Sequence, residues 1–268
     1  MNAPTAPIEL DRRQRFFLKY CCFPPPGRPP RPLGNHLSVD NPLGLLRHYY
    51  GSAFDEAIRD RVVVDIGCGH GDQVIGAAQA GAGRAVGIDM RPIFDEARAA
   101  ALGVADRITF TTRPIAELGT AWADVAFSQN SFEHFGNPAQ ILADAWGALK
   151  PGGTFFVTFG PPWWNPFGVH QFFMIKYPWM HFIFSERTIL GVRRLYRPDQ
   201  AMRWADTDGG LNQMTIAKFV GLVEASGFTM TRLALTPIRP LPAAIANLRL
   251  WREFTTSHVS AVLTKPAV

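Results

Sequence analysis

Residues 62–72 read VVVDIGCGHGD and decide the fold of the chain. A run of apolar, β-branched residues passes directly into three glycines, and a helical pattern follows. Glycine lets the backbone turn tightly and lets a ligand approach without meeting a Cβ atom. In open α/β sheets, ligands bind at the carboxyl ends of the strands. The stretch therefore predicts a strand, a ligand-binding turn and a helix.

The spacing of the three glycines distinguishes between classes of nucleotide ligand. A dinucleotide-binding turn has the pattern G-x-G-x-x-G, with its third glycine close to a pyrophosphate. Here Gly67, Gly69 and Gly71 follow G-x-G-x-G, and Asp72 occupies the place of that third glycine. A carboxylate facing a pyrophosphate is unfavourable, and no Gly-Lys-Ser/Thr sequence follows as in a phosphate-binding loop. The turn therefore favours a ligand without phosphates.

An acidic residue lies about twenty positions beyond the turn, where residues 86–90 read VGIDM. At the carboxyl end of a second strand, the carboxylate of Asp89 is placed to accept hydrogen bonds from two ribose hydroxyls. The alternative is that Asp89 caps a helix starting at Pro92. Its position at the strand's carboxyl edge favours the ribose.

Outward from this stretch, short β-branched runs alternate with alanine-rich helical runs. This alternation is typical of a parallel sheet with helices on both faces. We expect strands at 62–66, 85–88, 108–111, 125–128 and 154–159, with helices near 72–80, 93–102 and 139–149. Further along, we expect a helix at 215–225 and strands at 230–236 and 258–263.

Taken together, these stretches resemble the class I S-adenosylmethionine-dependent methyltransferases. Residues 65–71 resemble the first motif of that family, and residues 87–90 its ribose-binding strand end. The sequences ADVAFS at 123–128 and LKPGG at 149–153 resemble the motifs of its fourth and fifth strands. The resemblance covers residues 60–160 in detail. It implies a Rossmann-like α/β fold with a seven-stranded sheet, parallel except for one antiparallel strand, which residues 258–263 would supply.

The resemblance also implies S-adenosylmethionine as the cofactor. The residues expected to bind it are Asp65, Gly67, Cys68, Gly69, Gly71, Asp89, Met90, Pro114, Ile115, Ser128 and Gln129. One departure concerns adenine, because many relatives carry Gly-Asp-Ala after the third strand, where residues 113–116 here read RPIA. We therefore expect backbone groups and the apolar walls of Pro114 and Ile115 to hold the adenine.

Methyl transfer from a sulfonium is an in-line displacement that needs alignment and exclusion of water. A hydroxyl acceptor also benefits from a base such as histidine. Residues 128–135 read SQNSFEHF and follow the fourth strand, where related O-methyltransferases often carry a histidine pair as base. We therefore take His134 as the candidate base, with Glu133 orienting it or contacting the substrate. Alternatively, Glu133 bonds loop amides and His134 caps the next helix.

An aromatic- and proline-rich insertion follows the fifth strand, at about 160–210. We expect it to form a lid over the acceptor and assign Trp163, Trp164, His170 and His181 to the substrate site. Such a wall suits an amphiphilic, glycosidic or lipid-like small molecule. Two other roles stay open: contact with a membrane surface, helped by Arg187, Arg193, Arg194 and Arg197, and a homodimer interface.

Composition limits the remaining possibilities. Hydrophobic residues make up 47% and charged residues 18% of the 268 residues, which excludes wholesale disorder. The net charge of +5 is scattered along the chain. The three cysteines show no disulfide framework and no metal-ligand spacing, so we expect no metal and a cytoplasmic protein, with membrane association as an option. We expect 1–60 to form a terminal helix and a proline-rich connector at 24–32, and 61–268 to form the methyltransferase domain.

Three functional hypotheses follow. The first is an O-methyltransferase acting on a small molecule with His134 as base. The second is a C- or N-methyltransferase on the same scaffold, and the third is a catalytically silent subunit that binds the cofactor beside a partner. A nucleic acid substrate is not expected, because an Asn/Asp-Pro-Pro-Tyr motif is absent after the fourth strand and basic residues do not interleave with aromatics.

Overall fold

One seven-stranded sheet organises the chain, in the order β3-β2-β1-β4-β5-β7-β6. The computed structural model describes residues 8–28, 41–197, 199–207 and 209–267. The strands are β1 (Val62–Ile66), β2 (Arg84–Ile88), β3 (Ile108–Thr111), β4 (Ala123–Gln129), β5 (Leu149–Phe159), β6 (Thr229–Pro237) and β7 (Thr256–Thr264). Strand β7 runs antiparallel to both neighbours, and the pairs from β3 through β5 are parallel. The expected Rossmann-like fold with one reversed strand is confirmed.

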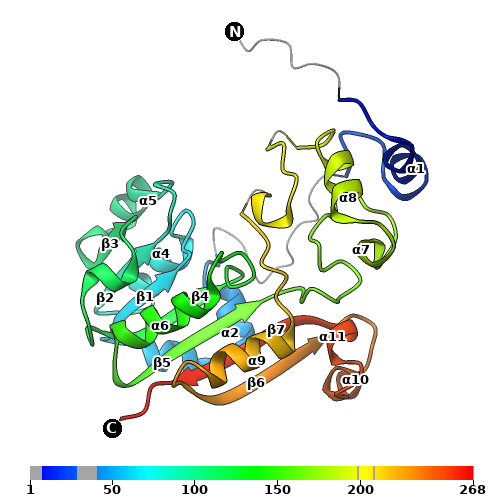
Figure 1. Cartoon of the computed structure of the whole chain (residues 1–268). Helices are drawn as coiled ribbons and strands as arrows, with labels where there is room; N and C mark the ends of the chain where they lie inside the picture. The colour runs from blue at the N-terminus through cyan, green and yellow to red at the C-terminus, as the bar shows by residue number, and fades with distance from the viewer. Residues whose placement is uncertain (1–7, 29–40, 198, 208, 268) are drawn as a thin grey trace.

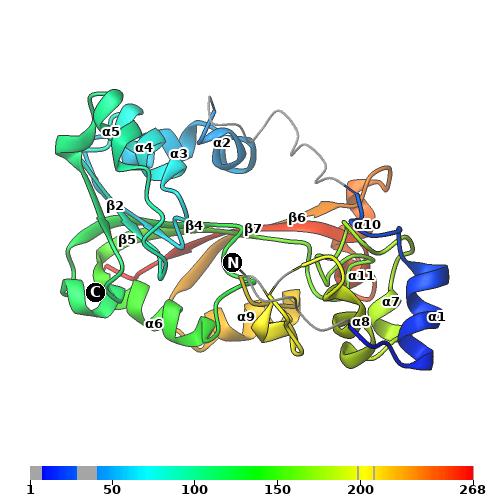
Figure 2. The ribbon, with the colours of Figure 1, turned by 90° about the horizontal axis from the view of Figure 1, so that it is seen from above.

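Helices cover both faces of the sheet, as Figure 2 shows. On one face lie α2 (Gly44–Tyr50), α3 (Ser52–Ile58), α4 (Asp72–Gln79) and α5 (Glu96–Ala101). On the other face lie α6 (Pro138–Ala148) and α9 (Ile216–Glu224), whose apolar side chains pack against β4, β5 and β7. The central strands β1, β2, β4 and β5 are therefore largely buried on both faces, and β1 reads as a continuous apolar run up to Asp65. The edge strands β3 and β6 are partly exposed.

Helices α2 and α3 were not expected from the sequence. They bury Leu46, Tyr50, Phe54 and Ile58 against the sheet, and the hydroxyl of Tyr50 donates to the carbonyl oxygen of Val157 in β5 at 2.8 Å. Each helix is only seven residues long, too short for a helical period to stand out in the sequence. This part of the chain thus packs with the sheet, while the domain boundary at residue 60 stays a prediction.

The insertion after β5 forms a third hydrophobic cluster together with the N-terminal helix α1 (Arg12–Cys21). It contains α7 (Met180–Ile183) and α8 (Glu186–Arg193), and Figure 1 shows these helices beside α1 at one end of the molecule. The side chain of Phe17 is fully buried there. Two further short helices, α10 (Ala243–Asn247) and α11 (Arg252–Thr255), connect β6 to β7 at the same end.

The proline-rich connector, the cysteines and the lengths of the helices were the other subjects of sequence-based expectations. The proline-rich connector lies partly outside the described residues, since 29–40 are not described. Cys21, Cys22 and Cys68 are all buried and free. Among the described residues, no helix is long and apolar enough to cross a membrane.

Candidate active site

The turn between β1 and α4 depends on its three glycines for different reasons. All three have left-handed backbones, with φ of 82°, 54° and 90° at Gly67, Gly69 and Gly71. A Cβ at Gly71 would lie 2.4 Å from the ring of Phe110, and one at Gly67 would lie 2.7 Å from the Cβ of Ser131. A Cβ at Gly69 would meet no atom within 4 Å. The first two glycines therefore allow close packing, whereas Gly69 borders open space that a ligand can enter.

Asp89 ties the end of β2 to this turn. Its Oδ2 accepts a hydrogen bond from the Gly69 amide at 2.9 Å, and its Oδ1 accepts one from the Arg91 amide at 3.0 Å. The next residue, Met90, is 93% exposed at the same edge of the sheet. The Asp89 carboxylate, the glycine turn without side chains and the exposed Met90 together form a surface suited to a nucleoside.

The alternative role of Asp89 as a helix cap is wrong. Helix α5 begins at Glu96 rather than near 93, and its N-cap is Asp95, whose side chain accepts a hydrogen bond from the Arg98 amide. A capping carboxylate must lie directly before the first helical turn. Asp95 meets that condition. The carboxylate of Asp89 instead bonds the glycine turn and can accept hydrogen bonds from a ligand.

Buried polar atoms without partners mark the carboxyl ends of β1 and β4. Among the described residues, no partner is found for Asp65 Oδ2, Ser128 Oγ or Gln129 Oε1. Burial raises the pKa of the Asp65 carboxyl well above its ordinary value, and the charge of Asp89 adds to this effect. Buried polar atoms are normally satisfied. These three, together with the open space at Gly69, fit a polar ligand at this edge.

The expected adenine wall is only partly available. Pro114 is exposed, but the side chain of Ile115 is 3% exposed and packs in the hydrophobic core. Cys68 is also buried, and its Sγ lies so close to Gly87 that a Cβ there would be 2.9 Å from it. Burial raises the pKa of the Cys68 thiol. Cys68 and Ile115 would therefore contribute backbone groups rather than side chains to a bound ligand.

The loop after β4 brings Glu133 and His134 beside the insertion. Glu133 is 3% exposed; its Oε1 accepts a hydrogen bond from the Gly160 amide at 3.1 Å, and its Oε2 has no partner among the described residues. Burial raises the pKa of Glu133, although the nearby His134 opposes that shift. His134 Nδ1 lies 2.6 Å from the carbonyl oxygen of Gly210. A carbonyl only accepts, so Nδ1 donates and Nε2 is the basic nitrogen.

His170 completes this group from the insertion. Its ring centroid lies 5.5 Å from that of His134, and its Nε2 donates to the carbonyl oxygen of Pro161 at 3.3 Å. Burial, with the neighbouring His134, lowers the pKa of His170 to about 4, so the ring is neutral at pH 7. One potential ligand atom from each of Glu133, His134 and His170 lies within 4.8 Å of the other two. The sequence analysis assigned Glu133 and His134 to catalysis and His170 to the substrate site, and the fold brings all three together.

The alternative role of His134 as the cap of the next helix is wrong. Helix α6 begins at Pro138, and its N-cap is Asn137, whose side chain accepts a hydrogen bond from the Gln140 amide. The same alternative had Glu133 bonding a backbone amide, and this agrees with the structure, because Glu133 accepts a hydrogen bond from the Gly160 amide. Glu133 is therefore a fixed part of the loop, whereas the Nε2 of His134 serves no capping role.

A short contact links this histidine group to the glycine turn. The hydroxyl of Ser131 donates to the carbonyl oxygen of Gly67 at 2.9 Å. From the other side, Asn212 Nδ2 donates to the carbonyl oxygens of Phe132 and Phe135 at 2.8 and 2.9 Å. Ser131 and Asn212 were not assigned from the sequence. Asn212 is 80 and 77 positions away from these two residues along the chain, and nothing local in the sequence indicated that it would contact the β4 loop.

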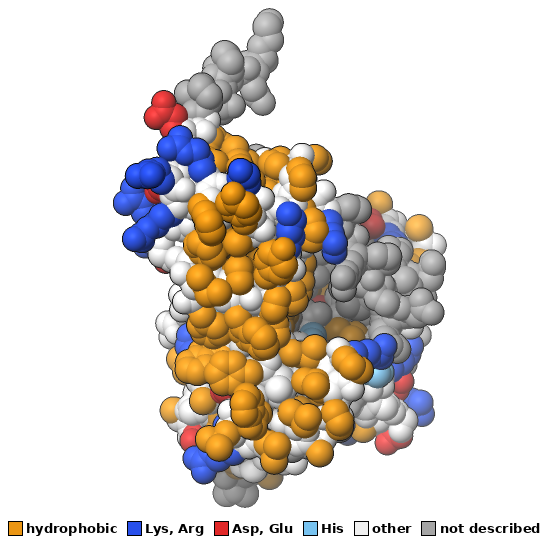
Figure 3. Space-filling view, turned by 90° about the vertical axis from the view of Figure 1, so that its right-hand side faces the viewer, with side chains coloured by type: hydrophobic (Ala, Val, Ile, Leu, Met, Phe, Trp, Pro, Cys, Tyr) orange, Lys and Arg blue, Asp and Glu red, His pale blue; other side chains and the backbone are white. Residues whose placement is uncertain are grey.

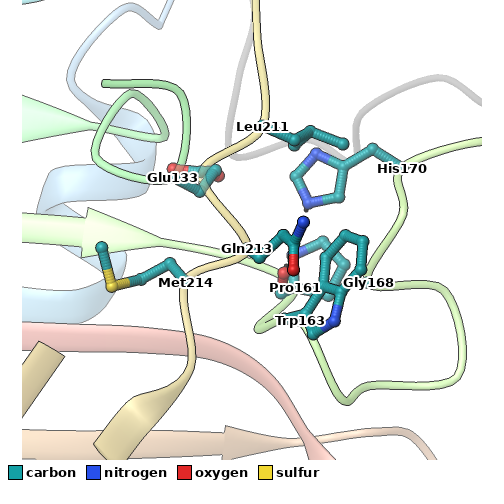
Figure 4. Close-up of a pocket in the computed structure, with 8 residues that line it drawn as sticks. All are labelled: Glu133, Pro161, Trp163, Gly168, His170, Leu211, Gln213 and Met214. Atoms are coloured by element: carbon teal, nitrogen blue, oxygen red, sulfur yellow. Dashed lines mark hydrogen bonds between the residues drawn. The ribbon is translucent and has the colours of Figure 1, made fainter. Parts of the chain in front are cut away.

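Figure 4 shows a narrow pocket at this point, with Glu133 and His170 on its walls. The other lining residues are Pro161, Trp163, Gly168, Leu211, Gln213 and Met214. The space it leaves for a water-sized sphere is about 0 Å³, so its walls would have to move apart before the reacting end of an acceptor could enter. Of the four residues assigned to the substrate, Trp163 and His170 line the pocket. Trp164 is 42% exposed and His181 packs on Trp163, and neither lines it.

Comparison with known proteins agrees with this architecture. Residues 64–157 match the family model described as a methyltransferase domain. No curated protein matches the sequence. Among solved structures, an S-adenosylmethionine-dependent methyltransferase from Mesorhizobium loti is 18% identical with a TM-score of 0.55, covering 85% of this chain and 100% of its own. Magnesium protoporphyrin IX methyltransferase from Synechocystis PCC 6803, with bound SAH, is 18% identical with a TM-score of 0.51, covering 85% and 81%.

A third solved structure, geranyl diphosphate methyltransferase in complex with SAM, is 14% identical with a TM-score of 0.51 and covers 87% of this chain and 93% of its own. At these identities the likeness to solved structures concerns the fold. The fold and the edge of polar groups at β1, β2 and β4 are those expected of a class I methyltransferase. With the family match over 64–157, the chain carries an S-adenosylmethionine-dependent methyltransferase domain and is an enzyme.

Two glycine variants should separate packing from cofactor binding. Gly71→Ala combines a left-handed alanine with a clash on Phe110, and we expect it to lower the free energy of unfolding by about 2–5 kcal/mol. Gly69→Ala meets no atom, so we expect a loss of only about 1–2 kcal/mol. Its Cβ enters the open space, however, and S-adenosylmethionine should bind at least about tenfold more weakly. Denaturant unfolding and calorimetric titration measure the two effects.

Equal S-adenosylmethionine affinity in Gly69→Ala and wild type would show that the ligand does not approach the turn at Gly69. Equal losses of stability in the two variants would contradict the packing argument at Phe110.

Proposed function

We propose that the enzyme transfers a methyl group from S-adenosylmethionine to a hydroxyl oxygen of an amphiphilic, glycosidic or lipid-like small molecule. The observation that carries this proposal is the Glu133–His134–His170 group, whose loop is joined to the glycine turn through Ser131. Two of its members, Glu133 and His170, line the pocket of Figure 4, and His134 lies next to them. A histidine with one ring nitrogen free of hydrogen bonds to the described residues suits a hydroxyl acceptor, since a hydroxyl must lose its proton.

Bound S-adenosylmethionine supplies the methyl group. The carboxylate of Asp89 and the backbone of Gly69 would hold the ribose of the cofactor. His134 Nε2 takes the proton of the acceptor hydroxyl, because the hydrogen bond to Gly210 keeps the proton of the neutral ring on Nδ1. The adjacent Glu133 carboxylate stabilises the imidazolium that results. The apolar walls of the pocket, among them Trp163, Leu211 and Met214, exclude water from the reacting atoms.

Incubation with methyl-labelled S-adenosylmethionine and a panel of acceptors tests this proposal. The panel holds hydroxyl-bearing lipids and glycosides, with amines and carbon acceptors of matched size as the comparison. We expect label on oxygen of a hydroxyl acceptor, located by mass spectrometry of the product. Label only on nitrogen or carbon would replace the proposal by the second hypothesis. Cofactor binding without transfer to any acceptor would favour the catalytically silent subunit.

Metal ions offer a sharp check on His134, because a bound ion and a proton would compete for the same nitrogen. If Nε2 is the base, dialysis against a chelator should leave the rate within about twofold of the untreated enzyme. Added Zn²⁺ should then inhibit by engaging the imidazole and carboxylate ligands that it prefers, whereas Mg²⁺ should not. Loss of activity on chelation, restored by a divalent ion, would instead assign the side chains of Glu133, His134 and His170 to a catalytic metal site.

A further inference from the structure

One face of the molecule is covered by exposed apolar side chains, as Figure 3 shows. We call it the apolar face and define it by side chains from α1, from the insertion and from the segment before α11. They are Phe16, Tyr20, Trp164, Tyr177, Trp179, Phe182, Ile183, Leu248, Leu250 and Trp251, each at least 38% exposed. The most exposed are Leu250 at 85% and Ile183 at 69%. Exposed apolar surface on this scale indicates an interaction site.

Ring contacts join the three parts of the apolar face. Phe16 of α1 lies 4.8 Å from Tyr20 and 6.4 Å from Phe184 at the end of α7, measured between ring centroids. Trp164 lies 6.1 Å from Phe182 of α7 and 5.4 Å from Phe254 of α11. The face is thus a continuous surface built from segments far apart in the sequence.

Helix α1 adds positive charge to one end of this face. Its Phe17 and Cys21 point into the core, while Phe16 and Tyr20 point outward. The exposed side of the helix also carries Arg12, Arg13, Arg15 and Lys19. None of these four forms an ion pair with another described residue. In Figure 3 these basic groups border the apolar surface at its α1 end.

One arginine that the sequence suggested for such a surface is excluded. Arg193 is 4% exposed, its Nε donates to Gln171 Oε1 at 3.0 Å, and it forms an ion pair with Asp199. It is therefore a structural residue of the insertion. Arg187 and Arg197 are exposed, whereas Arg194 is half-buried.

We propose that the apolar face binds the surface of an anionic lipid bilayer. Tryptophan and tyrosine side chains are favoured at the boundary between headgroups and acyl chains, and the unpaired cations of α1 match the charge of anionic headgroups. A second copy of the chain is a poorer occupant. A copy would present the same apolar side chains and the same cations, and none of the side chains that define the face is acidic and able to pair with those cations.

The apolar face also adjoins the pocket. Trp179 Nε1 donates to the carbonyl oxygen of Trp164 at 3.1 Å, and Trp164 follows Trp163, which lines the pocket. An amphiphile drawn from the bilayer would therefore have a short path to the reacting atoms. This last step rests on the proposed function, whereas binding to the bilayer does not depend on the identity of the acceptor.

Co-sedimentation of the full chain with lipid vesicles tests the proposal. We expect binding to vesicles of phosphatidylcholine with phosphatidylserine, and at least tenfold weaker binding to phosphatidylcholine alone. The double variant Ile183→Ser/Leu250→Ser should bind the mixed vesicles at least tenfold more weakly. Arg12→Gln/Arg15→Gln should lose most of the preference for phosphatidylserine. Leu102→Ser is the matched control, because Leu102 is 42% exposed next to α5, away from the apolar face.

Calorimetric titration with S-adenosylmethionine confirms that each variant is folded and keeps this test separate from the methyl transfer assay. Failure of the wild type to bind mixed vesicles would overturn the proposal. Binding by Ile183→Ser/Leu250→Ser at the level of Leu102→Ser would overturn it as well. A dimer in sedimentation analysis that dissociates in Ile183→Ser/Leu250→Ser, without vesicle binding, would assign the face to a second copy instead.

Discussion

A His134→Gln variant should lose about 100- to 10,000-fold in kcat, the range expected when a general base is removed. Its affinity for S-adenosylmethionine should stay within about twofold of the wild type, because His134 lies on the insertion side of the cofactor edge. Glutamine preserves much of the side-chain volume and can still donate to the carbonyl oxygen of Gly210, but it cannot take a proton. Single-turnover methylation of a hydroxyl acceptor and calorimetric titration measure the two quantities.

The matched control is His48→Gln, which replaces an exposed histidine outside the pocket and should retain the wild-type rate. A His134→Gln variant with the rate of His48→Gln would show that the proton leaves by another route. Loss of cofactor binding together with rate would indicate that His134 supports the fold of the β4 loop rather than the chemistry.

An Asp89→Ala variant should bind S-adenosylmethionine about 100-fold more weakly. Each hydrogen bond from a ribose hydroxyl to a carboxylate contributes about 1.5–3 kcal/mol, and about 1.4 kcal/mol corresponds to a factor of ten in affinity. The variant also removes the acceptor of the Gly69 amide, so the turn that borders the ligand loses one of its anchors. Calorimetric titration measures the change.

Asp95→Ala is the control for general damage to this part of the fold. It removes the N-cap of α5 and should cost about 1 kcal/mol of stability without altering affinity for the cofactor. Equal affinities of Asp89→Ala and the wild type would contradict the ribose assignment. The same loss in both variants would mean that the stability of the β2 edge, and not the Asp89 carboxylate, determines binding.

Much of the sheet could be predicted because its strands are short β-branched runs, and the central ones are largely buried on both sides. β1 and β3 have the predicted bounds, Val62–Ile66 and Ile108–Thr111, and the reversed β7 was expected from the family resemblance. The misses share a cause. Helices α2 and α3 and the delayed start of α5 at Glu96 are short segments whose structure is set by packing on the sheet, and a short segment has too few residues for a period to show.

Some residues of the candidate site could likewise be placed from the sequence, and others could not. Asp89 and Gly69 could be placed at one edge from the sequence, because parallel strands bring their carboxyl ends together. That Ile115 would point into the core instead of toward a ligand could not be predicted, since an isoleucine suits either environment. The contacts of Asn212 with the β4 loop, across 77 and 80 positions, are likewise beyond any local pattern.

By itself, the sequence determined the strand–turn–helix at 62–72, the absence of a phosphate-binding pattern and the acidic residue at the next strand. These follow from backbone sterics and from the alternation of apolar runs, which act between near neighbours. Only the tertiary structure decided that Glu133, His134 and His170 meet, and that α1 and the insertion share one apolar face. Those outcomes depend on how distant segments pack to bury their remaining apolar surface, and that packing is settled when the whole chain folds.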